Sequence, residues 1–234
     1  MVKFLASISN INEAHQVKNC DIDIVDLKNI DDGALGYVGI NTVFNISKIL
    51  NTHILSVTMG NEKNPNTLQY IHNVEQVINQ NIEFIKIGLF DKKLINEHKK
   101  FLEKIDCKNS KLICVLFADR TFDFDILKEI MDTRYHGVMI DTHYKNNNST
   151  TELLTIEDIE YFIHITRKNK KFSGISGSLK FKHIEILKKL NPNFLGFRGV
   201  LCDTLSKRKL LKTNLVDRVS KEIKKNALIN QGAA

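Results

Sequence analysis

The chain has 234 residues, of which 42% are hydrophobic and 26% are charged, a composition typical of globular rather than disordered proteins. It contains no run of about 18 apolar residues and no signal-peptide segment at its N-terminus, so we expect a soluble cytoplasmic protein without a membrane span. The net charge of +7 favours an anionic ligand, but Lys and Arg are spread evenly and form no aromatic-interleaved patch, which argues against nucleic acid.

The four cysteines, Cys20, Cys107, Cys114 and Cys202, are far apart and include no CxxC pair. This spacing predicts free thiols and argues against a zinc site or a disulfide framework. The sequence also carries no cofactor-binding motif, and we therefore expect neither a metal nor an organic cofactor.

Strand-like and helix-like patterns alternate along the whole chain. Short apolar runs that end in polar or glycine-containing sequence predict strands at residues 3–9, 22–28, 54–60, 84–89, 111–119, 137–142, 172–177 and 194–199. Amphipathic patterns between them predict helices at residues 11–17, 42–50, 68–79, 93–105, 122–131, 156–169, 181–190 and 213–225.

These alternating elements amount to about 29 residues per strand–helix unit, as in a compact (β/α)8 barrel. We therefore predict an α/β protein with a single TIM barrel over residues 1–228, followed by a disordered tail at 229–234. The alternative fold is a doubly wound open sheet, which usually has a glycine-rich turn after its first strand. No such turn follows the first predicted strand here.

Two predicted strands carry a lysine where a buried strand normally has an apolar residue. Lys86 lies inside the fourth strand, and Lys28 ends the second. The alternation of side chains directs both lysines into the barrel, together with Asp26, and the same count directs Asp141 inward from the sixth strand. The inward residues of the two lysine-bearing strands are Ile22, Ile24, Asp26, Lys28, Phe84, Lys86 and Gly88.

Lys28, Lys86 and Asp141 are therefore expected to converge at the carboxyl ends of the strands, where TIM barrels have their active sites. Burial disfavours a charged amine, and a neutral amine can attack a carbonyl group. Other interpretations are compatible with each residue alone. Lys28 could extend to solvent or pair with Asp26, and Asp141 could cap the next loop.

The last two barrel units contain small residues that predict a phosphate site. Gly177 and Ser178 lie at the end of the seventh predicted strand, and Arg198 and Gly199 lie at the end of the eighth. Small residues let backbone N–H groups approach an anion, a helix N-terminus beyond each loop adds a favourable dipole, and Arg198 could bind the phosphate bidentately. Glycine here could also serve only turn geometry.

Two further features are open to two interpretations. Residues 33–36, Gly-Ala-Leu-Gly, form a small-residue loop beside Lys28 that either admits a substrate or is only a turn. His143 follows Asp141, and we expect it at the surface rather than as a catalytic base.

Several motifs run in a fixed order over almost the whole chain. They are Asp26-Leu27-Lys28-Asn29, Asp32-Gly33-Ala34-Leu35-Gly36, Lys86-Ile87-Gly88-Leu89, Asp141-Thr142-His143-Tyr144-Lys145, Gly177-Ser178-Leu179 and Arg198-Gly199. This series resembles the (5-formylfuran-3-yl)methyl phosphate synthase family of methanofuran biosynthesis, whose members occur in methanogens and some methylotrophic bacteria. The chain departs from the family at Ile30, where proline is common.

The resemblance implies a TIM-barrel lyase that condenses two molecules of glyceraldehyde 3-phosphate into a phosphorylated furan aldehyde, with loss of phosphate and water. It implies that Lys28 forms the Schiff base and that Lys86 transfers protons, with Asp141 and Lys145 completing the site. Asp26, one pleat below Lys28, is expected to tune the charge of that lysine. The partner would be a small phosphorylated aldehyde, and a homo-oligomer is compatible with the sequence.

Three other functions are compatible with the same residues. A class I aldolase-like phosphosugar lyase would share the imine lysine but release a product of different mass. A non-catalytic sensor of phosphorylated metabolites would bind its ligand without turnover. A nucleic-acid-binding protein would retard DNA or RNA in a strongly salt-dependent way.

Overall fold

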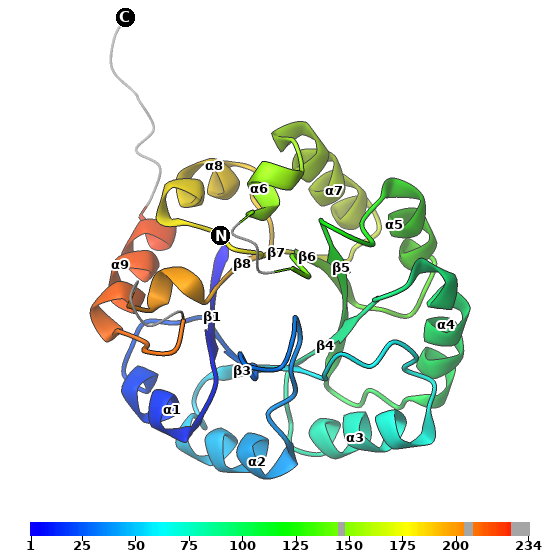
Figure 1. Cartoon of the computed structure of the whole chain (residues 1–234), viewed down its shortest axis with the longest axis horizontal. Coiled ribbons are helices and arrows are strands. Elements are labelled where there is room, and N and C mark those ends of the chain that lie inside the picture. Colours follow the sequence, from blue (N-terminus) through cyan, green and yellow to red (C-terminus); the bar gives the residue numbers. More distant parts are fainter. Residues whose placement is uncertain (145–147, 204–207, 226–234) are drawn as a thin grey trace, which may run out of the picture.

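The eight strands of the protein form a closed parallel barrel. The structure is a computed structural model that describes residues 1–144, 148–203 and 208–225. Each strand pairs with the next in sequence order, and β8 pairs with β1 to close the ring (Figure 1). The strands are β1 (Lys3–Ile8), β2 (Ile24–Leu27), β3 (Ile54–Thr58), β4 (Phe84–Gly88), β5 (Lys111–Phe117), β6 (Gly137–Asp141), β7 (Phe172–Ile175) and β8 (Phe194–Phe197). The predicted TIM barrel is confirmed.

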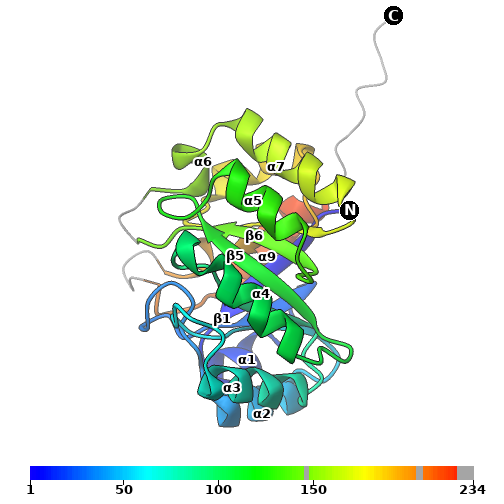
Figure 2. The ribbon, with the colours of Figure 1, turned by 90° about the vertical axis from the view of Figure 1, so that its right-hand side faces the viewer.

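Helices surround the barrel, and Figure 2 shows α4 and α5 lying across the outer face of β5 and β6. The helices are α1 (Ile11–Val17), α2 (Ile40–Ile49), α3 (Leu68–Ile78), α4 (Ile95–Lys104), α5 (Phe124–Met131), α6 (Thr150–Leu153), α7 (Ile156–Lys168), α8 (Ile184–Lys189) and α9 (Thr213–Lys224). Short 3-10 turns are η1 (Lys92–Leu94), η2 (Phe181–His183) and η3 (Gly199–Leu201). Side-chain caps fix several helix starts, as where Asn10 accepts from the Glu13 N–H and Thr155 from the Asp158 N–H.

The predicted strands run too far at their carboxyl ends. Each observed strand ends one or two residues earlier than its apolar pattern does, so that Lys28, Arg198 and Gly177 lie just beyond their strands. The predicted helix 42–50 begins two residues earlier at Ile40, and α6 was not predicted. The predicted tail at 229–234 lies outside the described residues.

The two faces of the strands pack into separate apolar layers, as the alternation predicts. Val25, Leu27, Ile85 and Ile87 contact the helices, whereas Ile24, Phe84, Ile113, Met139 and Phe194 fill the barrel axis. Ile22 was expected inside the barrel but packs in the outer layer, because β2 begins only at Ile24 and the alternation does not extend back to it.

Loops close half of the barrel mouth. Ala34 and Leu35, after β2, and Phe90, after β4, are buried in the inner apolar cluster. The small-residue loop is therefore a packed turn rather than an opening for substrate. Gly36 has no room for a Cβ, which would lie 2.4 Å from the carbonyl oxygens of Asn29 and Asp32. The open half of the mouth lies towards β1, β6, β7 and β8.

All four cysteines are free, as predicted, and Cys114 and Cys202 are buried. Within residues 1–144, 148–203 and 208–225, no helix is long and apolar enough to cross a bilayer.

A buried histidine lies between the helical layer and the barrel. His98, on α4, shares a 2.7 Å hydrogen bond between its Nδ1 and the Tyr135 hydroxyl, and its Nε2 has no partner among the described residues. Burial lowers the pKa of His98 to about 4. In the unfolded chain the pKa of histidine is about 6.5, so between these values the unfolded state binds a proton that the folded state excludes.

We expect acid to destabilise the protein through His98. Its contribution is fully present above pH 6.5 and is lost as the pH falls towards 4, which amounts to about 2 kcal/mol between pH 7.5 and pH 5. His98→Asn keeps a polar atom opposite Tyr135 but cannot titrate. Urea unfolding at the two pH values should therefore show that the free energy of unfolding falls less for this variant than for the parent protein.

The control is His164→Asn, which removes an exposed imidazole from α7. An equal pH dependence in His98→Asn and the parent protein would show that His98 does not carry this effect.

Candidate active site

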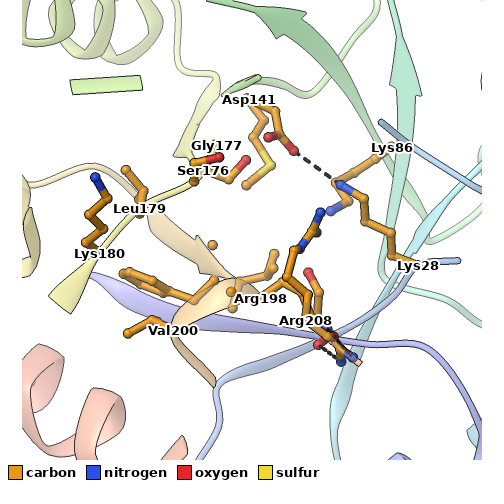
Figure 3. A pocket seen from close by; sticks show the side chains of 17 residues that line it. Lys28, Lys86, Asp141, Ser176, Gly177, Leu179, Lys180, Arg198, Val200 and Arg208 are labelled. Carbon is orange, nitrogen blue, oxygen red and sulfur yellow. Dashed lines mark hydrogen bonds and ion pairs between the residues drawn. The ribbon is translucent and has the colours of Figure 1, made fainter. Parts of the chain in front are cut away.

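A cavity of about 470 Å³ opens at the carboxyl ends of the strands on the open half of the mouth (Figure 3). This volume lies within the range of small-molecule sites. Its lining comes from strands that are far apart in sequence, and the residues are Leu5, Ser7, Lys28, Lys86, Met139, Asp141, Ser176, Gly177, Ser178, Leu179, Lys180, Gly196, Phe197, Arg198, Gly199, Val200 and Arg208. The structure thus brings together the sequence-predicted residues Lys28, Lys86 and Asp141.

Lys86 forms a buried ion pair with Asp26. The lysine Nζ lies 2.7 Å from Oδ1 of Asp26, and the two side chains are 4% and 0% exposed. Ser7 fixes the carboxylate from the other side, because its hydroxyl donates to Oδ2 over 2.8 Å. Asp26 was expected to tune Lys28, but it pairs with Lys86 instead, because residues two apart on one strand are separated by about 6.6 Å. A carboxylate on a different strand is closer to each lysine.

Lys28 pairs with Asp141 across the barrel. Its Nζ lies 3.4 Å from Oδ2 of the carboxylate, and both side chains are almost fully buried (Figure 3). The backbone N–H of Lys28 continues the strand ladder by donating to Ile8, and Asp141 Oδ1 accepts from the Thr142 N–H over 2.7 Å. Lys28 does not extend to solvent. Asp141 stands within hydrogen-bonding distance of a buried amine and can exchange a proton with it.

Other polar residues near the mouth do not line the cavity. Asp119, after β5, accepts hydrogen bonds from the backbone N–H groups of His143 and Tyr144. The His143 ring contacts Phe90 and Phe117 and bonds with Arg120, so it is half-buried rather than at the surface as expected, and it is not among the residues that line the cavity. Lys145 lies outside the described residues.

The loop after β7 makes a tight turn in which Gly177 has no room for a side chain. Gly177 has a φ of +93°, and Ser178 has a φ of +49°, so the backbone makes a left-handed turn. A Cβ on Gly177 would lie 2.4 Å from the Thr150 hydroxyl oxygen. That hydroxyl donates to the Ser176 carbonyl, and the Thr150 N–H donates to Gly177, so that α6 holds the loop in place.

The sequence did carry a signal for α6. Ser149 and Glu152 form a capping box, in which the Glu152 carboxylate accepts from the Ser149 N–H over 2.6 Å. This S-x-x-E spacing marks helix starts. A helix of only four residues was nonetheless too short to show a periodic apolar pattern.

Arg198 has a structural partner that the sequence did not predict. All five of its N–H donors are used, two of them in a bidentate contact with Glu13 of α1 at 2.7 and 2.9 Å. The remaining donors reach the carbonyls of Ser7 and Arg208. The expected bidentate contact with phosphate is therefore replaced by one with Glu13, which is itself 4% exposed and needs a cationic partner.

The helix expected beyond each phosphate loop is only partly present. The chain after β7 enters the turn η2 and then α8, but after β8 the residues that the structure describes before α9, which begins at Thr213, form only the turn η3. Any anion at the eighth strand would thus meet the small-residue backbone at Gly199, which has open space around it, rather than the end of a long helix.

The sequence reasoning missed several lining residues, among them Ser7, Lys180 and Arg208. Ser7 could have been found, since strand alternation places it on the inward face with Leu5. Lys180, paired with Glu152 at 3.2 Å, and Arg208, in the loop after β8, carried no periodic signal.

Cations dominate the cavity wall. Five basic side chains line it, whereas Asp141 is the one acidic residue among the lining residues that the structure describes. A cavity wall of this charge favours an anionic small molecule and raises its local concentration.

Relatives of known sequence match this chain over nearly its full length. The (5-formylfuran-3-yl)methyl phosphate synthase of Archaeoglobus fulgidus is 25% identical over 237 residues, covering 95% of this chain and 99% of the relative. The enzyme of the same name from Methanococcus aeolicus is 29% identical over 211 residues, covering 85% and 89%.

Solved structures share the fold at low identity. The 3-hexulose-6-phosphate synthase of Salmonella typhimurium superposes with a TM-score of 0.65 at 9% identity, covering 95% of this chain and all of the other. Phosphoribosylanthranilate isomerase of Thermotoga maritima superposes with a TM-score of 0.60 at 13% identity, covering 96% and 99%. These likenesses concern the barrel alone.

The family model of 4-HFC-P synthase matches residues 4–220, which include all of the barrel strands except the first residue of β1, together with the lysines and carboxylates of the cavity. The chain therefore belongs to the 4-HFC-P synthase family.

Proposed function

We propose that this protein is a (5-formylfuran-3-yl)methyl phosphate synthase of methanofuran biosynthesis. In this proposal it condenses two molecules of glyceraldehyde 3-phosphate through an imine on Lys28, with loss of inorganic phosphate and water. The observation that carries the proposal is the buried amine of Lys28, 3.4 Å from the Asp141 carboxylate, in a cavity walled by cations. Family membership and the names of the relatives support the overall activity.

The two ion pairs suit different roles. Asp141 lies 3.4 Å from the Lys28 amine, so a small approach of the two groups lets the carboxylate remove a proton from the amine. The neutral amine then attacks the aldehyde carbon, a C–N bond forms, and the carbonyl oxygen leaves as water. The resulting iminium nitrogen accepts the electron pair when a proton is removed from the neighbouring carbon.

Lys86 is suited to donate protons. Asp26 lies 2.7 Å from its ammonium group and stabilises the charged form. A charged lysine in a cavity that excludes most water can protonate a leaving oxygen during dehydration or loss of phosphate. We assign the phosphate groups of the substrates to the backbone of Gly177, Ser178 and Gly199, three small residues that line the cavity.

The central experiment is product analysis after incubation with glyceraldehyde 3-phosphate alone. The wild-type protein should yield a phosphorylated furan aldehyde, detected by absorbance and mass, and borohydride should leave a reduced adduct on Lys28. Lys28→Arg keeps the positive charge but has no amine that forms an imine, so it should lose both signals. Lys3→Arg, at the opposite end of β1, is the matched control and should keep them.

A folded wild-type protein that releases a phosphosugar instead of the furan would favour the aldolase-like alternative. An adduct on another lysine would refute the assignment to Lys28.

We expect Asp26→Asn to lower both stability and turnover. The substitution leaves the Lys86 ammonium buried without its counter-charge, which should cost about 3–5 kcal/mol in the free energy of unfolding. Loss of a positioned proton donor should lower kcat by about 10²-fold or more. Asp26→Asn combined with Lys86→Met should recover much of the stability but none of the activity.

Glu83→Gln provides the control, since it breaks the half-exposed pair with Lys111 at the other end of β4 and β5. Such a pair contributes at most about 1 kcal/mol. If Asp26→Asn and Glu83→Gln lower the free energy of unfolding in urea by the same amount, burial of the Asp26–Lys86 pair does not increase its contribution to stability.

The two glycines of the phosphate loops should respond differently to alanine. Gly177→Ala places a Cβ against Thr150 at a positive φ, and we expect a stability loss of about 1–3 kcal/mol from the backbone strain alone. Gly199→Ala meets nothing within 4 Å, so it should fold as the parent does but raise KM by narrowing the approach to the backbone. Thermal unfolding and steady-state kinetics distinguish these outcomes. An unchanged KM in Gly199→Ala would remove that loop from the phosphate assignment.

A further inference from the structure

The loop after β8 returns to the cavity at Arg208. Its two arms are joined by backbone hydrogen bonds from Asp203 N–H to the Leu210 carbonyl and from Lys212 N–H to the Leu201 carbonyl. Arg208 lies within the loop that these bonds close. Its φ of +76° is a left-handed backbone conformation that residues other than glycine rarely adopt. Such strain persists only where neighbouring contacts enforce it, and it is concentrated at functional sites.

The contacts that enforce this conformation come from Arg198. The carbonyl oxygen of Arg208 accepts hydrogen bonds from Arg198 Nε at 3.0 Å and Nη2 at 2.6 Å. Arg198 is in turn fixed by the two oxygens of Glu13, whose side chain also accepts from the Ser9 N–H. A series of buried contacts thus runs from α1 through the end of β8 to the backbone of Arg208.

The Arg208 side chain is a desolvated cation at the cavity wall (Figure 3). Desolvation lowers the pKa of its guanidinium, the Asp141 carboxylate acts in the opposite direction, and the Arg198 charge lowers it further. Within the described part of the chain, no residue accepts a hydrogen bond from this guanidinium or forms an ion pair with it. A half-buried cation beside a second guanidinium is costly unless an anion joins it.

We infer that Arg208 binds the phosphate dianion of the substrate and that Glu13 and Arg198 are positioning residues that fix it. The planar fork of a guanidinium matches two phosphate oxygens. A three-carbon aldehyde phosphate is short, so its phosphate must be bound close to the amine that attacks the aldehyde. Arg208 meets this requirement because it lines the same cavity as Lys28 and its partner Asp141.

This inference rests on the proposed function for the identity of the substrate but not for the phosphate contact itself. Binding of inorganic phosphate, measured by calorimetry, tests the contact without any turnover. Arg208→Gln should weaken phosphate binding at least 10-fold and should raise KM for glyceraldehyde 3-phosphate more than it lowers kcat. Phosphate binding by Arg208→Lys should be weaker than that of the wild type and tighter than that of Arg208→Gln, because lysine keeps the positive charge but lacks the planar guanidinium fork.

Lys209→Gln is the matched control. It removes the same charge one residue away, from an exposed side chain that pairs with Asp31 at 3.1 Å, and should leave phosphate binding unchanged. Phosphate binding by Arg208→Gln as tight as that of the wild type would overturn the inference. A wild-type protein that binds phosphate through Arg208 but yields no furan would refute the proposed function and leave the inference intact.

The positioning role needs a separate measurement. If Glu13 acts through Arg208, Glu13→Gln should weaken phosphate binding, and adding it to Arg208→Gln should cause no further loss. Independent, additive losses would overturn the positioning role. Because removal of the Glu13 charge leaves Arg198 buried and unpaired, Glu13→Asp serves as the second variant should the first fail to fold. It keeps the charge but shortens the reach to Arg198, and the same cycle with Arg208→Gln applies.

Discussion

Compensation of buried charge is the constraint on which this structure depends. A closed parallel barrel leaves little water at its axis, so an inward lysine must find a carboxylate from another part of the chain. Asp26 meets this need for Lys86 and Asp141 meets it for Lys28, and each pair joins strands that are not adjacent in the sheet. The cost of burying these charges ties the formation of the cavity to correct closure of the barrel.

The two pairs also differ in a way that matters for chemistry. Lys86 is held at 2.7 Å by a carboxylate that Ser7 orients, whereas Lys28 lies 3.4 Å from Asp141. A close ion pair stabilises a buried ammonium ion more strongly than a longer contact does. The barrel interior therefore holds two lysines whose carboxylate partners lie on different strands and at different distances.

The inward direction of Lys28, Lys86 and Asp141 could be predicted from strand alternation, because the period of two depends only on the backbone. The pairing could not, since it depends on the register between strands. Thr58 is the register partner of Lys86, whereas Asp26 is level with Ser56 and reaches Lys86 only through the length of the lysine side chain. The apolar patterns also ran past the true strand ends, where Arg198 turns away to meet Glu13. Such a contact, 185 residues apart in sequence, leaves no local signal.

The contact between Glu13 and Arg198 connects site geometry to the way the barrel closes. α1 follows the first strand and Arg198 follows the last, so their bidentate pair spans the junction at which β8 meets β1. The same guanidinium holds the backbone of Arg208 at the cavity wall. An open or misregistered junction would separate Glu13 from Arg198 and release Arg208. The part of the positive wall formed by Arg198 and Arg208 is therefore assembled only when the first and last units of the barrel have paired.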